Sequence, residues 1–90
     1  MSKYSVEQFN EDLLRIRQMA ENSKVDYIGY DKNSFKVSFK DDILGLKIEV
    51  YLSKMTICIN SKCKSNNMQY LKNQSWEQIN SIMKSLYNYI

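Results

Sequence analysis

Between Ser34 and Asn60 apolar and polar residues alternate along the chain, which is the pattern of strands with one buried face. A shorter stretch before Ser34 has the same character, and polar residues that favour tight turns separate the segments. The predicted strands are residues 25–30, 34–40, 44–52 and 55–60. Strands joined by such short turns pair with their neighbours, so the pattern predicts a four-stranded antiparallel meander.

Two-residue turns give the four predicted strands one common set of faces. The turns are placed at Lys32-Asn33, Asp41-Asp42 and Ser53-Lys54. Residues that flank such a turn lie opposite each other on the same face of the sheet. The predicted apolar pairs are Tyr30 with Phe35, Phe39 with Leu44, and Leu52 with Met55. All apolar sets then share one side, with Ile28 and Tyr30 as the inward residues of the first strand.

Apolar residues spaced alternately three and four apart predict a helix at each end of the chain, over residues 5–22 and 75–89. In each helix a serine precedes a glutamine by three residues, which is the pattern of a capping box, at Ser5 and Gln8 and at Ser75 and Gln78. Tyr4 and Phe9 are placed to form a hydrophobic staple. The polar segment 61–74 is predicted to be a long connection, with a turn of helix at residues 68–71.

The expected fold is therefore a single α+β domain over residues 1–90, ordered α-β-β-β-β-α. Both amphipathic helices and the sheet bury one side, so we expect the helices side by side on one sheet face. The other face is then open to solvent or to a partner. Its predicted residues are Tyr27, Lys36, Ser38, Lys40, Ile43, Lys47, Glu49, Tyr51, Thr56, Cys58 and Asn60.

The residue inventory argues against most catalytic and metal chemistry. The chain has no histidine, which excludes Ser-His and Cys-His pairs, and its two glycines are isolated, which excludes a glycine-rich phosphate loop. Cys58 and Cys63 alone make a poor zinc site, and Asp41-Asp42 is more typical of a polar turn than of a cation site. We expect a non-enzyme without cofactor or metal.

The N-terminus lacks a signal-peptide pattern and no apolar run is long enough to span a bilayer, so a cytoplasmic location with reduced thiols is expected. A small disulfide between Cys58 and Cys63 remains the alternative. Abundant Lys, Asn, Ile and Tyr with few Arg are typical of AT-rich coding DNA, as in low-GC bacteria, their phages and their plasmids.

The helix–strands–helix order resembles double-stranded-RNA-binding domains in topology. That family's second helix begins with basic residues, whereas the corresponding segment here reads Ser75-Trp76-Glu77-Gln78. The net charge of +3 is also small for a nucleic-acid-binding domain. The resemblance therefore implies a fold but no RNA-binding role for this chain.

The function expected from these patterns is a small protein-binding module, a phage- or mobile-element-encoded inhibitor or regulator of the anti-CRISPR kind. Its partner is expected to be a host protein or nucleoprotein complex. The alternative is a nucleic-acid-binding module that uses the open face or the Lys-rich loop, and the chain is expected to be a monomer or a homodimer. The candidate partner-binding residues are Tyr27, Lys36, Lys40, Lys47, Tyr51, Lys54, Lys62 and Lys64, with Lys72 in the same basic loop patch.

Overall fold

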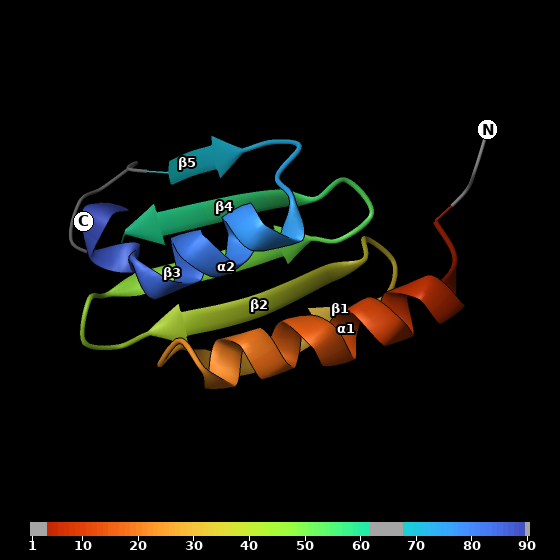
Figure 1. Ribbon diagram of the computed structural model, residues 1–90, viewed down its shortest axis with the longest axis horizontal. Helices are drawn as coiled ribbons and strands as arrows, with labels where there is room; N and C mark the ends of the chain where they lie inside the picture. The colour runs from red at the N-terminus through yellow and green to blue at the C-terminus, as the bar shows by residue number, and fades with distance from the viewer. Residues whose placement is uncertain (1–3, 62–67, 90) are drawn as a thin grey trace.

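A five-stranded antiparallel sheet carries both helices on one of its faces (Figure 1). The computed structural model describes residues 4–61 and 68–89. The elements are α1 (Val6–Glu21), β1 (Asp26–Asp31), β2 (Lys36–Asp41), β3 (Leu46–Tyr51), β4 (Thr56–Ser61), β5 (Met68–Leu71), α2 (Trp76–Lys84) and the 3₁₀ helix η1 (Leu86–Tyr89). The predicted α+β meander with two terminal helices is confirmed, with five strands rather than four.

Helix α1 begins as predicted at Ser5, whose side chain accepts a hydrogen bond from the Gln8 backbone N–H at 3.0 Å. The second half of the predicted capping box is wrong, because the Gln8 amide donates to Asp12 instead (3.0 Å). The rings of Tyr4 and Phe9 both pack against Phe35, with centroids 4.9 and 5.5 Å away. The start of α1 is thereby fixed to the turn between β1 and β2.

Helix α2 has the complete capping box predicted from Ser75 and Gln78. It ends at Lys84, earlier than predicted, and continues as η1. The Ser85 hydroxyl donates to the Ser81 carbonyl at 2.6 Å, a bond of the kind that bends helices. The tighter last turn keeps Leu86 buried in the core.

The three hairpins close through four residues each rather than two, at 32–35, 42–45 and 52–55. The last residue of each turn has a positive φ: Phe35 at 53°, Gly45 at 67° and Met55 at 48°. Phe35 and Met55 both pack against the core, which helps to offset the cost of this backbone conformation for a residue with a side chain. Residues assigned by alternation to strand ends therefore belong to turns.

The longer turns shift the register but preserve the faces. Phe39 lies opposite Ile48 rather than Leu44, and Tyr30 lies opposite Val37 rather than Phe35. The β3–β4 hairpin keeps its predicted alignment, since Tyr51 pairs with Thr56. Each shift is an even number of residues, so every apolar set of β2, β3 and β4 still points to the core.

Strand β1 departs from simple alternation at a bulge between Tyr27 and Gly29. The prediction of Ile28 as inward is wrong, because it is the extra residue of the bulge and 51% exposed. Tyr27, predicted for the open face, instead lies opposite Phe39 with its ring centroid 5.9 Å away. The guanidinium of Arg17 covers the other side of this ring at 4.3 Å.

Strand β5 occupies part of the segment predicted to be a connection, and the predicted turn of helix at residues 68–71 is wrong. Its four residues pair antiparallel with β4, with Tyr70 opposite Cys58 and Leu71 opposite Ile57. Only Leu71 among them packs against the core. A strand this short, stabilised mainly by pairing with β4, leaves little local pattern to read.

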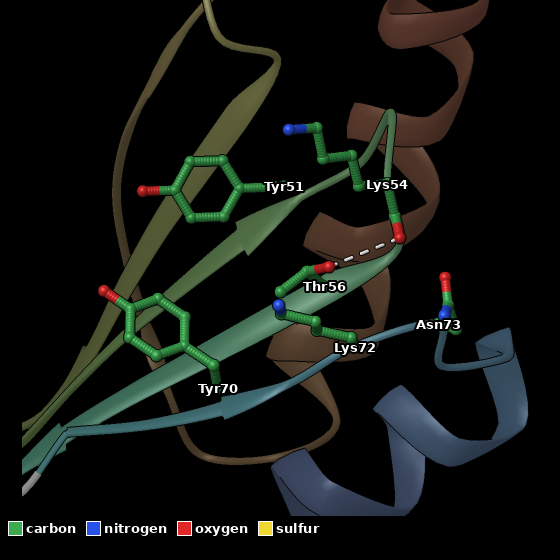
Figure 2. A pocket seen from close by; sticks show the side chains of 6 residues that line it. All are labelled: Tyr51, Lys54, Thr56, Tyr70, Lys72 and Asn73. Carbon is green, nitrogen blue, oxygen red and sulfur yellow. Dashed lines mark hydrogen bonds between the residues drawn. The ribbon is translucent and has the colours of Figure 1, made fainter.

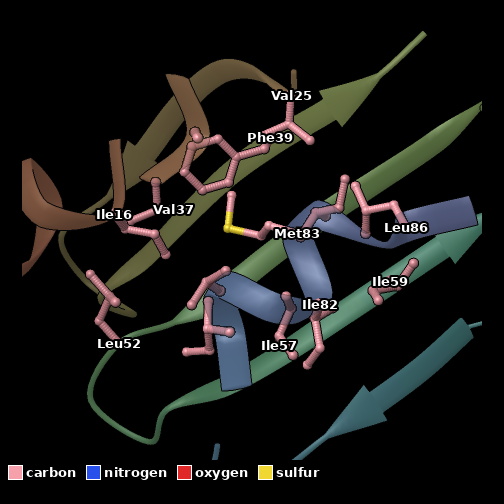
Figure 3. Packing of buried hydrophobic residues seen from close by; sticks show 14 of the residues in the cluster. Ile16, Val25, Val37, Phe39, Leu52, Ile57, Ile59, Ile82, Met83 and Leu86 are labelled. Carbon is pink, nitrogen blue, oxygen red and sulfur yellow. The ribbon is translucent and has the colours of Figure 1, made fainter. Parts of the chain in front are cut away.

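The core fills the space between the helices and the sheet (Figure 3). Met83 of α2 points toward Phe39 of β2, and both are almost fully buried. The remaining fully buried large side chains come from α1, the strands, the turns and α2: Phe9, Ile16, Val37, Leu46, Ile48, Val50, Leu52, Ile57, Ile59 and Ile79. The helix-bearing face of the sheet is thus occupied, and the opposite face is the open one.

Candidate partner-binding face

The open face of the sheet is organised in rows that run across the strands. The register aligns Lys36, Tyr51 and Thr56 in one row, and Glu49, Cys58 and Tyr70 in the next. A third row contains Lys40, Lys47, Asn60 and Met68. Neighbours within a row lie close enough for their side chains to interact.

Most of the predicted open-face residues lie where alternation places them. Lys36, Lys40, Lys47 and Tyr51 share this face, and Lys54 lies in the turn at its edge. Tyr27 does not lie on this face, because the bulge in β1 turns its side chain toward Phe39. Ile43 belongs to the turn 42–45 and is 96% exposed. Lys62 and Lys64 lie outside the described residues.

Ion pairs neutralise the β2 side of this face. The Lys36 ammonium lies 3.0 Å from the Glu49 carboxylate, and that of Lys40 lies 3.3 Å from Asp42. The hydrogen bond from Lys36 to Glu49, with the charge of that carboxylate, raises the pKa of Lys36. Across residues 4–61 and 68–89 the only ion pairs are these two, so Lys47, Lys54 and Lys72 keep uncompensated charge. The unpaired positive charge therefore lies on the side of β3, β4 and β5.

A pocket of about 450 Å³ opens at that side of the face, and we call it the Tyr–Lys pocket. Its lining residues are Tyr51, Lys54, Thr56, Tyr70, Lys72 and Asn73. Figure 2 shows the Tyr51 and Tyr70 rings on the same side of the sheet, with Lys54 and Lys72 reaching toward that side from the β3–β4 turn and from the segment after β5. The volume is in the range of small-ligand sites.

Backbone hydrogen bonding holds the wall of the pocket that follows β5. The Gln74 N–H donates to the Met55 carbonyl at 2.8 Å, and the Gln74 side chain donates to the Lys72 carbonyl at 3.0 Å. Asn73, between Lys72 and Gln74, has a φ of 57°, which asparagine tolerates better than most residues. The segment is thus tied to the β3–β4 turn, and Lys72 is held on the same side as Lys54.

Cys58 lies on the open face but is only 2% exposed. Burial raises the pKa of its thiol, which opposes formation of the nucleophilic thiolate. The neighbouring Tyr70 also has a raised pKa, caused first by its closeness to Cys58. The Tyr70 hydroxyl donates to the Met68 sulfur at 3.0 Å. Both groups are therefore uncharged near neutral pH, and the pocket is lined by aromatic surface and ammonium groups.

The chemistry of the Tyr–Lys pocket suits an anionic group attached to an apolar or aromatic body. Ammonium groups attract carboxylates and phosphates, and tyrosine supplies a large contact area with a hydrogen-bonding end. Within the described ranges, no group of three or more His, Cys, Asp or Glu side chains is positioned to hold a metal ion. None of the helices in the same ranges is long and apolar enough to cross a bilayer.

Sequence reasoning named Lys54 and Lys72 but missed Tyr70 and Asn73. The four residues Met68–Leu71 show no apolar–polar alternation, since the apolar Met68 and Leu71 lie on opposite faces of β5, so the sequence offers no clear signal for this strand. Comparison of the chain with protein-family models, curated proteins and solved structures found no significant match. The functional argument therefore depends on the chemistry of this face.

Proposed function

We propose that this protein is a non-enzymatic binding module that contacts another protein through its open sheet face, centred on the Tyr–Lys pocket. The proposed role is that of an inhibitor or regulator encoded by a phage or mobile element, acting in the cytoplasm on a host protein or nucleoprotein complex. The observation that carries the proposal is that Tyr51 and Tyr70 line one pocket together with two lysines, Lys54 and Lys72. The ammonium groups of these lysines have no ion-pair partner in the described structure.

Tyrosine supports a protein-binding role because it is enriched at the energetic centres of protein interfaces. Tyr70 is 57% exposed, and Tyr51 lines the same pocket from β3. An aromatic side chain at such a position loses exposed apolar area when a partner covers it. The tyrosines are therefore the expected anchors, and the rest of the face supplies complementarity.

The free lysines indicate the charge of the partner. Lys47, Lys54 and Lys72 are exposed on or beside one side of the face, whereas Lys36 and Lys40 are occupied by carboxylates. Lysines in this arrangement attract an acidic surface and speed its association. An acidic partner protein fits both the aromatic and the ionic part of the pocket.

The proposal of a non-enzyme is supported by the side chains that could carry chemistry. The chain contains no histidine, and the buried thiol of Cys58 is held protonated. A thiol without a base beside it and without access to solvent is a weak nucleophile. The aromatic and ammonium groups that line the pocket are of the kind that bind a partner.

A pull-down with the tagged protein from a host lysate tests the proposal. We expect a stoichiometric protein partner whose capture is weakened by Tyr51→Ala and by Lys47→Glu. Ile43→Ala is the matched control, because Ile43 is 96% exposed in a turn outside the pocket. Recovery of nucleic acid alone, or equal capture by all variants, would contradict the proposal.

A nucleic-acid-binding role is the second candidate, and the pocket itself favours it. Bases stack on tyrosines, and lysines follow the phosphates of a single strand. The two ion pairs remove positive charge from β2, which narrows the available basic surface. Binding of single-stranded DNA or RNA that weakens steeply with salt, and that is lost in Tyr70→Ala, would support this candidate.

A further inference from the structure

The two edges of the sheet differ in how they are protected against pairing with another chain. Edge strand β1 begins and ends with aspartates, at Asp26 and Asp31, and carries the bulge at Ile28. Charges and bulges are devices that keep edge strands from pairing. Strand β5, Met68–Leu71, has neither a charged residue nor a bulge.

The outer side of β5 offers backbone hydrogen-bonding groups to a partner. In the described structure β5 pairs with β4 alone, and Figure 1 shows it at the margin of the sheet. Alternate residues of an antiparallel strand direct their N–H and C=O groups to opposite sides, so part of the β5 backbone points outward. Such an edge is suited to accept one more extended strand.

An added strand would lie directly beside the Tyr–Lys pocket. Neighbouring strands are about 4.8 Å apart, so a side chain opposite Tyr70 would extend the row formed by Glu49, Cys58 and Tyr70. The next side chain on the same face lies two residues away along the added strand. In one direction it approaches Lys72, whose ammonium group has no ion-pair partner among the described residues.

We propose that β5 accepts an extended segment of an acidic partner protein as a sixth strand. This segment carries an aromatic or β-branched residue opposite Tyr70 and a carboxylate two residues away that pairs with Lys72. The inference rests on the proposed protein-binding function and adds the conformation and side-chain pattern of the bound segment. The charge of Lys72 favours an acidic segment over a neutral one, and the exposed Tyr70 favours an aromatic or β-branched residue opposite it.

Selection from a display library of random peptides, with the immobilised full-length protein as bait, tests this inference. We expect enrichment of sequences with alternating β-branched or aromatic residues and one Asp or Glu two positions from an aromatic or β-branched residue. A synthetic peptide with the enriched sequence is then titrated by fluorescence anisotropy. N-methylation of its backbone should abolish binding at alternate positions only, because only alternate amides face β5.

Protein variants provide the second arm of the test. Lys72→Glu should weaken binding of the synthetic peptide about tenfold or more, through loss of a charge-assisted contact. Lys32→Glu is the matched control, since Lys32 lies in the turn between β1 and β2, away from β5, and it should leave the affinity unchanged. Gln69→Pro and Tyr70→Pro each remove one backbone N–H of β5. Because these two residues are adjacent, one of the N–H groups points toward β4 and the other points outward. Circular dichroism identifies which variant keeps the fold.

Enriched peptides that lack the acidic residue, tolerate N-methylation throughout, or ignore Lys72→Glu would overturn the inference, as would a library without enrichment. A dimer of the wild-type protein, detected by light scattering and dissociated by Lys72→Glu or by the folded proline variant, would also overturn the inference, because a second copy would then occupy β5. A protein partner captured equally by wild type and Lys72→Glu, but lost in Tyr51→Ala, overturns strand addition and leaves the proposed function standing. The proposed function itself is tested separately by the pull-down, and equal capture of the partner by Tyr51→Ala and Ile43→Ala would contradict it.

Discussion

The two faces of the central strands carry side chains of opposite character only one residue apart. In β3, Ile48 is fully buried under the helices, whereas its neighbours Lys47 and Glu49 lie on the open face. On the buried face every position contributes to stability through packing. On the open face, ion pairs occupy the β2 side, and the Tyr–Lys pocket lies toward β5. Alternate residues of the same strands thus either pack in the core or lie on the open face, which is the face that we propose binds a partner.

The largest expected effect of a single substitution is on the buried face. Phe39→Ala removes a fully buried ring that Met83 approaches, and should lower the free energy of unfolding by about 3–5 kcal/mol. Ser38→Ala, one residue away on the open face, should change it by less than about 0.5 kcal/mol. Urea denaturation of both variants measures the difference. Equal losses would mean that the two faces are not distinct.

A smaller effect tests the bulge in β1. Tyr27→Ala removes a ring that packs on Phe39 and under Arg17, and should cost about 1–3 kcal/mol. Ile28→Ala should cost less than about 0.5 kcal/mol, because Ile28 is 51% exposed. Thermal unfolding of the two variants decides between the bulge and simple alternation, which predicts the reverse order.

On the open face, the Lys36–Glu49 ion pair should contribute less to the free energy of unfolding than the packing of Phe39 or Tyr27. Glu49→Gln is expected to cost about 0.2–1 kcal/mol at neutral pH, since the pair is partly exposed. Because the pKa of Lys36 is raised by Glu49, this stabilisation is complete below the usual lysine pKa and disappears as the pH rises through the raised value. A double-mutant cycle with Lys36→Met measures the coupling, and a coupling of zero would show that the pair adds no stability.

The smallest effect at neutral pH is the titration of groups that stay protonated in the folded state. Burial and the hydrogen bond to Asp12 raise the pKa of Tyr4, and burial raises that of Cys58. The unfolded chain loses these protons first, so the contribution of these two groups to stability is constant below about pH 7.5 and falls as the pH rises through the ordinary cysteine and then the ordinary tyrosine pKa. Urea midpoints between pH 7 and pH 11 measure the decline. In Tyr4→Phe the decline above pH 10 should be shallower, and an unchanged slope would contradict the assignment.

Local patterns in the sequence were enough to predict the fold class, the helix starts and the face of nearly every residue in β2, β3 and β4. Period-two alternation decides these faces because a residue directs its side chain to one side or the other whatever its partner is. Serine caps are equally local, since Ser5 and Ser75 each bond to a backbone N–H three residues on. Lys36, Lys40, Lys47 and Tyr51 were placed on the open face by this argument alone.

The turn lengths, the bulge and the fifth strand could not be predicted from local patterns. Phe35 and Met55 leave the strands because their side chains pack on the core from turn positions, where the backbone takes a positive φ. Tyr27 faces the core because Phe39 and Arg17 offer it contacts from other elements. Strand β5 exists through pairing with β4, and that pairing brings Tyr70 and Lys72 to Tyr51 and Lys54. Each of these features depends on contacts between different helices, strands and turns, whose energies no local pattern contains.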